Sequence, residues 1–217
     1  MAFDAAGLRL CLVTDRGLAG GRDVVDIALA AVRGGATMVQ LREKDATTRA
    51  FVEQARALKA ALAPLGVPLA INDRLDVALA VDADGLHVGQ DDMPVEEARR
   101  LMGPGKFIGL SITAVDQVLR PDAEAADYLG VGPIYLQRTK EDAAAPLGID
   151  GLRRLRGLTG KPIVAVGGLT PDNSAPVLAA GADGLAVVSA IVAAADPEAA
   201  AGRFRALWGE GAVGSRQ

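Results

Sequence analysis

The stretch Gly181-Ala182-Asp183-Gly184-Leu185-Ala186-Val187-Val188-Ser189 decides the fold, because a turn, a short apolar run and a polar end follow one another in it. Ala-Asp followed by Gly-Leu or Tyr-Leu occurs twice more, at 83–86 and 126–129, each time at the start of an apolar run. Gly35-Ala36 is a reduced version of the same pattern. Such a pattern marks the end of a helix, a tight turn and the entry into a strand.

Short apolar runs alternate along the whole chain with Ala-, Leu- and Arg-rich helical segments. Near-continuous apolar runs are typical of parallel strands that are covered on both faces. We expect strands at Leu8–Asp15, Thr37–Glu43, Pro68–Asn72, Gly85–Gly89, Phe107–Thr113, Tyr128–Ile134, Pro162–Gly168 and Gly184–Ala190. We expect helices at Val24–Arg33, Arg49–Ala63, Val95–Met102, Gly151–Leu158, Pro171–Ala179 and Pro197–Trp208.

Eight β-α units in one chain of this length predict an α/β fold, a single-domain (β/α)₈ TIM barrel. It would span residues 1–217, with its core at about residues 8–208 and a flexible tail at 209–217. An open, doubly wound sheet is the competing arrangement, but that fold often carries a G-x-G-x-x-G turn after its first strand. Here the first strand ends in Thr14-Asp15-Arg16-Gly17, so the barrel is favoured.

The composition excludes several kinds of chemistry. The 217 residues include one His and one Cys, and only 3% are aromatic. A zinc site of His and Cys ligands, a disulfide framework and aromatic stacking on single-stranded nucleic acid are therefore not supported. Cys11 lies inside an apolar run, which predicts a buried, unreactive thiol. The net charge of −4 does not suggest nucleic-acid binding.

The sequence also lacks signals for export or membrane insertion. The first residues do not show the basic-then-apolar pattern of a signal peptide, and no apolar stretch approaches the roughly 20 residues that span a bilayer. We therefore expect a soluble, cytoplasmic protein with no membrane partner.

Polar residues at the expected strand ends point to an anionic ligand. In a barrel, catalytic groups gather at the carboxyl ends of the strands. Gln40, Arg42 and Lys44 share one face of the second strand, because side chains alternate with a period of two. Two cations on one face of the rim favour an anion there, although a solvated loop would also explain them.

Asp73 and Asp92 end the neighbouring third and fourth strands. Two carboxylates beside an anion make sense with a cation between them, and Mg²⁺ prefers one or two carboxylates together with waters and phosphate oxygens. Together with Lys140, they predict a diphosphate–Mg²⁺ site. Either carboxylate alone would be better explained as a helix cap or a surface charge.

Three further features refine this expectation. Gly167-Gly168 and Ser189 end the last two strands, where barrels often bind phosphate through backbone N–H groups. His87 lies inside the fourth strand and is expected to be a structural, hydrogen-bonded histidine. No Cys nucleophile or Ser-His-Asp set is visible, so a charged leaving group assisted by Mg²⁺ and cations suits these residues.

These motifs resemble the thiamine phosphate synthase family over residues 10 to 208. They are Val39-Gln40-Leu41-Arg42-Glu43-Lys44, Ile71-Asn72-Asp73-Arg74, Gly85-Leu86-His87-Val88-Gly89-Gln90-Asp91-Asp92, Gly130-Val131-Gly132-Pro133-Ile134-Tyr135, Thr139-Lys140, Val166-Gly167-Gly168 and the stretch Gly181–Ile191. The resemblance implies a (β/α)₈ transferase of thiamine biosynthesis. It would join hydroxymethylpyrimidine diphosphate to hydroxyethylthiazole phosphate and release pyrophosphate.

The resemblance also implies roles for single residues. Arg42, Lys44, Lys140 and Ser111 would be catalytic, and Asp73 and Asp92 would coordinate Mg²⁺. The substrates would be bound by Gln40, Arg42, Lys44, Asn72, Ser111, Gln137, Thr139, Lys140, Gly168, Val188 and Ser189. The last three would take the thiazole phosphate.

Two departures from the family pattern leave alternatives open. The loop after the sixth strand reads Leu136-Gln137-Arg138, where relatives carry Pro-Thr, and Thr113 stands where they often carry His. A thiazole tautomerase or a non-catalytic barrel that binds a phosphorylated ligand are the alternatives. The loop at 137–145 could close as a lid, and a homo-oligomer is possible.

Overall fold

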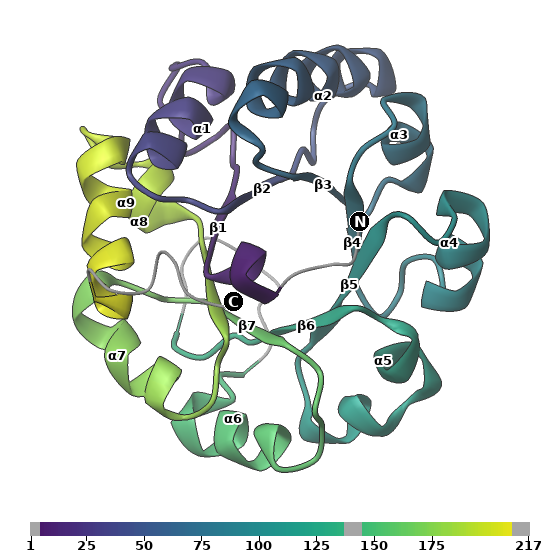
Figure 1. The fold of residues 1–217 in the computed structure, drawn as a ribbon, viewed down its shortest axis with the longest axis vertical. Coiled ribbons are helices and arrows are strands. Elements are labelled where there is room, and N and C mark those ends of the chain that lie inside the picture. The colour runs from purple at the N-terminus through teal and green to yellow at the C-terminus, as the bar shows by residue number, and fades with distance from the viewer. Residues whose placement is uncertain (1–4, 137–144, 210–217) are drawn as a thin grey trace, which may run out of the picture.

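Eight parallel strands form one closed barrel in the order of the sequence (Figure 1). The structure is a computed structural model that describes residues 5–136 and 145–209. The strands are β1 (Leu10–Val13), β2 (Met38–Leu41), β3 (Leu69–Asn72), β4 (Gly85–Val88), β5 (Phe107–Ile112), β6 (Tyr128–Val131), β7 (Ile163–Val166) and β8 (Gly184–Val187). Leu10 of β1 pairs with Leu185 of β8 and closes the ring. The predicted (β/α)₈ barrel is confirmed, and the open sheet is excluded because it would leave two edge strands unpaired.

The helices form the outer ring of the barrel. They are α1 (Val24–Arg33), α2 (Thr48–Leu62), α3 (Leu75–Ala80), α4 (Val95–Met102), α5 (Pro121–Ala125), α6 (Gly148–Arg156), α7 (Pro171–Ala179), α8 (Ser189–Val192) and α9 (Pro197–Arg205), with 3₁₀ turns η1 (Ala5–Leu8), η2 (Ala63–Leu65), η3 (Val115–Leu119) and η4 (Ala206–Trp208). The sequence-based assignment missed α3, α5 and α8, because such short segments carry too little helical periodicity. Within the described ranges, no helix is long and apolar enough to cross a membrane.

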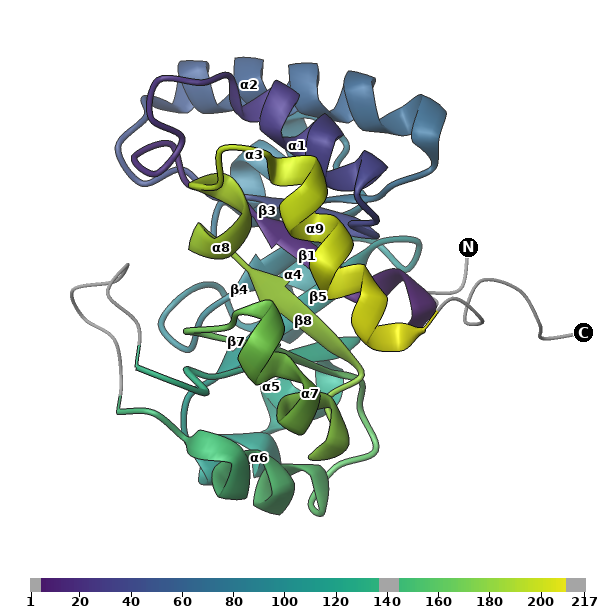
Figure 2. The ribbon, with the colours of Figure 1, turned by 90° about the vertical axis from the view of Figure 1, so that its left-hand side faces the viewer.

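Two apolar layers make up the core. The outer layer fills the space between strands and helices, and an inner cluster that includes Cys11, Met38 and Tyr128 fills the barrel itself. Cys11 is 1% exposed, which confirms the expectation of a buried thiol, and this burial raises the pKa of the thiol to about 12. The turn η1 lies at the end of the barrel opposite α8 (Figure 2). It packs so closely that a Cβ on Gly184 would lie 1.9 Å from the Leu8 carbonyl oxygen.

The Ala-Asp repeat has a structural function at the entry of the even-numbered strands. Each repeat Asp makes two hydrogen bonds to a single residue of the preceding strand. Its backbone N–H donates to the carbonyl of that residue, and its carboxylate accepts the backbone N–H of that residue. The pairs are Asp84 with Leu69, Asp127 with Ile108 and Asp183 with Ile163, at 2.7 to 3.0 Å. Thr37 does the same to Leu10 through its hydroxyl, at 2.8 and 3.0 Å. The reduced repeat at 35–36 is therefore the fourth member of one pattern.

Candidate active site

A cavity of about 690 Å³ opens at the carboxyl ends of the strands and reaches down into the barrel. Its floor is lined by apolar side chains of the inner cluster, among them Cys11, Met38 and Val164. Its mouth is lined by charged and polar residues that follow the strands. This division suits a ligand with an uncharged ring and a charged group.

The strand β2 and the residues that follow it bring three predicted residues to this cavity. Gln40, Arg42 and Lys44 all line it, although β2 ends at Leu41, so that only Gln40 is placed there by the alternation of a strand. Gln40 is 6% exposed and lies beside Val13 in the register of β1 and β2. The side chains of Arg42 and Lys44 lie close enough to Asp73 to lower its pKa.

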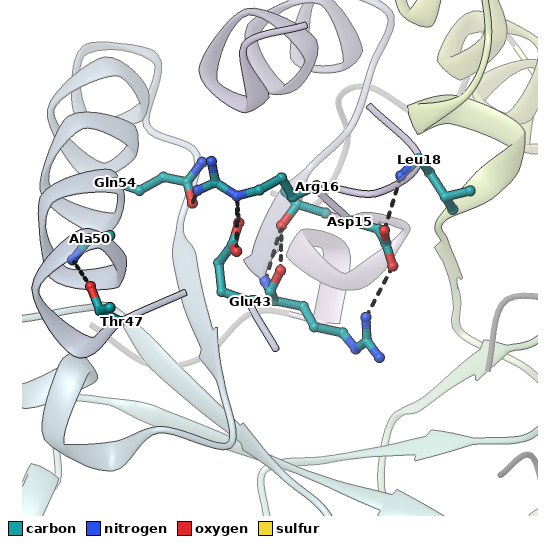
Figure 3. A network of polar contacts seen from close by, with 9 residues as sticks. Asp15, Arg16, Leu18, Glu43, Thr47, Ala50 and Gln54 are labelled. Atoms are coloured by element: carbon teal, nitrogen blue, oxygen red, sulfur yellow. Dashed lines mark hydrogen bonds and ion pairs between the residues drawn. The ribbon is translucent and has the colours of Figure 1, made fainter. Parts of the chain in front are cut away.

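The end of β1 holds the end of β2 in place, and sequence reasoning missed this. Thr14 Oγ1 accepts the backbone N–H of Arg42 at 3.0 Å, and Asp15 Oδ2 lies 3.1 Å from Arg42 Nη1. One residue further, Arg16 Nε donates to both carboxylate oxygens of Glu43 at 3.1 and 3.2 Å (Figure 3). The Asp15–Arg42 pair belongs to the cavity lining, so Asp15 is a site residue that the sequence alone did not indicate.

Asp73 and Asp92 meet at the mouth, as predicted. Asp73 has a left-handed backbone (φ 63°), and its N–H donates to the His87 carbonyl at 2.8 Å. Asn72 Nδ2 donates to Asp73 Oδ1 at 2.7 Å, and the backbone N–H of Gly89 donates to Asp92 Oδ2 at 2.7 Å. The pKa of Asp73 is raised to about 6, mainly by burial and then by the charge and hydrogen bond of Asp92. The positive charges of Lys44 and Arg42 lower this pKa and offset part of the rise.

This carboxylate pair fits a divalent cation. Asp92 raises the proton affinity of Asp73, and the repulsion between the two carboxylates is relieved when a cation lies between them. No group of three or more potential His, Cys, Asp or Glu ligands occurs in the part of the chain that the structure describes. A pair without a third protein ligand suits Mg²⁺, which keeps waters and takes phosphate oxygens from a substrate.

Ser111 lines the cavity, and its hydroxyl is hydrogen-bonded to the buried ring of His87. Its Oγ lies 2.9 Å from His87 Nε2, and His87 Nδ1 lies 2.9 Å from the Tyr128 hydroxyl. Burial lowers the pKa of His87 to about 4, so the ring is neutral near pH 7. The expectation of a hydrogen-bonded, buried histidine is confirmed. The contact with Ser111 was not predicted, because it depends on the register between β4 and β5.

The ends of β7 and β8 give a mixed result. Val188 lines the cavity, whereas Gly168 and Ser189 are not among its lining residues. Gly167 and Gly168 both have positive φ angles, of 101° and 65°. A Cβ on Gly168 would lie 2.8 Å from the Leu136 carbonyl oxygen. These glycines are thus required by the backbone turn and by close packing, whatever they bind.

Several predicted features lie outside the described residues. These are Gln137, Thr139 and Lys140, nearly all of the loop at 137–145, and the tail beyond residue 209. Conversely, sequence reasoning missed Gln90, Gln117 and Arg120 as lining residues. Arg120 Nη1 donates to Gln90 Oε1 at 3.1 Å, and Gln90 Nε2 donates to the Ser111 carbonyl at 2.8 Å. No motif in the sequence singles out Arg120 or Gln117.

A closed (β/α)₈ barrel with a charged cavity at its carboxyl end defines the class of this protein as a barrel enzyme. The sequence matches the thiamine monophosphate synthase family over residues 10–191. It is 56% identical to the thiamine-phosphate synthases of Albidiferax ferrireducens, over 92% of this chain and 91% of that protein, and of Chloroflexus aurantiacus, over 92% of each. A solved thiamine phosphate pyrophosphorylase from Pyrococcus furiosus superposes with a TM-score of 0.85 at 37% identity, over 94% of this chain and 96% of that one. The chain therefore belongs to the thiamine monophosphate synthase family and is a transferase.

Proposed function

We propose that this protein is a thiamine phosphate synthase. It would couple hydroxymethylpyrimidine diphosphate with hydroxyethylthiazole phosphate to give thiamine phosphate and pyrophosphate. The bond between the pyrimidine methylene carbon and the diphosphate oxygen breaks, and its electron pair leaves with the diphosphate. The carbocation is then trapped by the lone pair of the thiazole nitrogen, which forms the new carbon–nitrogen bond.

The observation that carries this proposal is the meeting of two cations and two carboxylates at one cavity mouth, above an apolar floor. Arg42 and Lys44 would bind the departing diphosphate and stabilise the charge that develops on its oxygen. Asp73 and Asp92 would hold Mg²⁺, which when bound supplies further positive charge to the leaving group. Gln40, Asn72 and Ser111 would bind and orient the pyrimidine diphosphate.

The remaining roles rest on the family resemblance. Gln137, Thr139 and Lys140 would complete the diphosphate site, and Gly168, Val188 and Ser189 would bind the thiazole phosphate. Support from the described residues is strongest for Val188, which lines the cavity. Because both substrates are phosphorylated and cross membranes poorly, we expect the reaction to take place in the cytoplasm.

A pyrophosphate-release assay with both substrates tests the proposal. Release is expected only when both substrates and Mg²⁺ are present, and thiamine phosphate should form in equal amount. Binding of either substrate without release under all conditions would overturn the proposal and favour a ligand-binding barrel. Isomerisation of a thiazole substrate without Mg²⁺ would instead favour a tautomerase.

A further inference from the structure

Three side chains from neighbouring strands form a hydrogen-bonded row beneath the cavity mouth. Ser111 comes from β5, His87 from β4 and Tyr128 from β6, and both links to the His87 ring measure 2.9 Å. His87 is 7% and Tyr128 1% exposed. Three buried or half-buried polar groups are thus joined in an otherwise apolar barrel.

The barrel makes room for this row with two glycines. Gly109 lies between His87 and Tyr128 in the strand register, and Gly130 lies beside Ser111. A Cβ on Gly109 would lie 2.2 Å from Tyr128 Cζ and 2.5 Å from His87 Nδ1, and one on Gly130 would lie 2.7 Å from His87 Cε1. The imidazole therefore occupies a slot that a side chain at either position would close. Such a fit fixes which atoms each ring nitrogen faces.

The directions of these hydrogen bonds depend on one another. A neutral imidazole has one N–H donor and one acceptor nitrogen. A phenol is a better hydrogen-bond donor and a poorer acceptor than an aliphatic hydroxyl, because the lone pair of its oxygen is delocalised into the ring. Of the two hydroxyls that lie 2.9 Å from the His87 ring nitrogens, that of Tyr128 is therefore the donor, and it donates to Nδ1. His87 then carries its proton on Nε2 and donates it to Ser111 Oγ.

This arrangement leaves the Ser111 proton unused within the row. A serine hydroxyl that accepts from below can donate into the cavity that it lines. In the opposite tautomer, Ser111 would donate to Nε2 and could offer only a lone pair to a ligand. The tautomer of His87 therefore decides whether Ser111 is a donor or an acceptor toward the ligand.

We propose that His87, held as its Nε2–H tautomer by Tyr128, is a positioning residue that makes the Ser111 hydroxyl a hydrogen-bond donor into the cavity. The ligand group at Ser111 then carries a lone pair, as a pyrimidine ring nitrogen or a diphosphate oxygen does. Only the identity of this ligand rests on the proposed function, because the row itself exists without one.

The composition offers a direct test, because His87 is the only histidine in the chain. A long-range ¹H–¹⁵N NMR spectrum of the uniformly labelled protein should therefore contain the imidazole signals of His87 alone. Its two ring nitrogens can be identified without a comparison among several histidines. At neutral pH we expect Nε2 at the position of a protonated nitrogen and Nδ1 at that of an unprotonated one. The reverse pattern, or equal averaging of the two, would overturn the proposal.

Tyrosine variants test how the tautomer is held. Tyr128→Phe removes the hydroxyl and keeps the ring, so we expect the two nitrogen signals to move toward each other as the tautomers mix. Tyr135→Phe is the matched control, because Tyr135, the only other tyrosine, donates its hydroxyl to the Asn173 carbonyl at 3.0 Å. An unchanged His87 spectrum in folded Tyr128→Phe would contradict the role of Tyr128.

A ligand measurement shows whether the row acts through Ser111. Tyr128→Phe is expected to weaken binding of the pyrimidine diphosphate about tenfold, and to do so less than twofold when Ser111→Ala is already present. Equal effects in both backgrounds would mean that Tyr128 acts by another route. Binding of inorganic pyrophosphate and of the pyrimidine alcohol, each alone, shows which group Ser111 contacts. A protein without coupling activity would refute the proposed function and leave the NMR result to decide the tautomer.

Discussion

Asp15 Oδ2 lies 3.1 Å from Arg42 Nη1, and this ion pair joins the ends of β1 and β2 at the cavity mouth. The second oxygen of Asp15 accepts the backbone N–H of Leu18 at 3.1 Å, so the carboxylate is held from both sides. The two side chains are 18% and 22% exposed, which limits screening by water. One edge of the guanidinium is thereby fixed, and its other N–H groups can face an anion.

Asp15→Asn is therefore expected to weaken anion binding without unfolding the protein. A hydrogen bond to a charged group contributes about 1.5–3 kcal/mol when it is shielded, so we expect binding of pyrophosphate with Mg²⁺ to weaken about tenfold. Isothermal titration calorimetry measures this directly. The effect should disappear when Arg42 is first replaced by Gln.

Glu198→Gln provides the control for Asp15→Asn. It removes one carboxylate from an exposed pair, Arg33–Glu198, which joins α1 to α9 on the outside of the barrel. Pyrophosphate affinity should be the same as in the unchanged protein. If both variants weakened binding equally, the loss would reflect net charge rather than the position of Arg42.

The Asp15–Arg42 pair also shows where sequence reasoning stops. Alternation along one strand is a local rule, and the three residues that it grouped, Gln40, Arg42 and Lys44, do line one cavity, although β2 itself ends at Leu41. The contact between Asp15 and Arg42 depends on the register between two strands, in which Val13 lies beside Gln40. No local pattern encodes that register, and the same holds for the row from Ser111 to Tyr128.

Asp73→Asn should separate activity from stability. The pKa of Asp73 is about 4 in the unfolded chain and about 6 in the folded protein. The protein without metal therefore loses stability as the pH rises through this range. Replacing the carboxylate by an amide removes that loss. After a discount for solvent screening, we expect a gain of about 1 kcal/mol in unfolding free energy at pH 8 without Mg²⁺. Asn also tolerates the left-handed backbone at this position.

Turnover of the same variant should fall by orders of magnitude, because one of the two proposed Mg²⁺ ligands is gone. Asp91→Asn is the matched control, since it removes the same charge from the neighbouring position of Asp92 and is expected to lose far less activity. Urea unfolding and pyrophosphate release, both with and without Mg²⁺, give the two readouts. An Asp73→Asn protein that is less stable, or that keeps near-normal turnover, would contradict the assignment.

His87 makes the folded protein sensitive to acid. Its pKa is about 4 when folded and about 6.5 when unfolded, so the unfolded chain binds more protons between these values. The contribution of His87 to stability is fully present above pH 6.5 and is lost as pH falls toward 4. The unfolding free energy of the unchanged protein should drop by about 2–3 kcal/mol more than that of His87→Gln between pH 8 and 4.5. Parallel pH profiles of the two proteins would show that folding does not lower the pKa of His87.

From the sequence alone, the Ala-Asp repeat predicts a helix end, a tight turn and the entry into a strand. That interpretation is correct, yet it gave no reason for the Asp. The structure supplies one, because each repeat Asp accepts an N–H from the first or second residue of the preceding strand, at the end of the barrel where the strands begin. Thr37 extends this pattern to β2, where the sequence shows no Asp at all.

Variants at these strand entries should affect stability and leave chemistry unchanged. Thr37→Val keeps the shape of the side chain but loses both hydrogen bonds to Leu10, one donated and one accepted, at 3.2 and 3.0 Å. Asp84→Ala leaves the Leu69 N–H without its carboxylate. Each change should cost about 1–3 kcal/mol in unfolding free energy, since a backbone donor at the end of the barrel is left unpaired.

Because these positions lie at the end opposite the cavity, kcat/KM for pyrophosphate release should stay within about twofold of the unchanged protein at temperatures where the variants are folded. A folded variant with much lower kcat/KM would mean that the end of the barrel where the strands begin controls the geometry of the cavity at the other end.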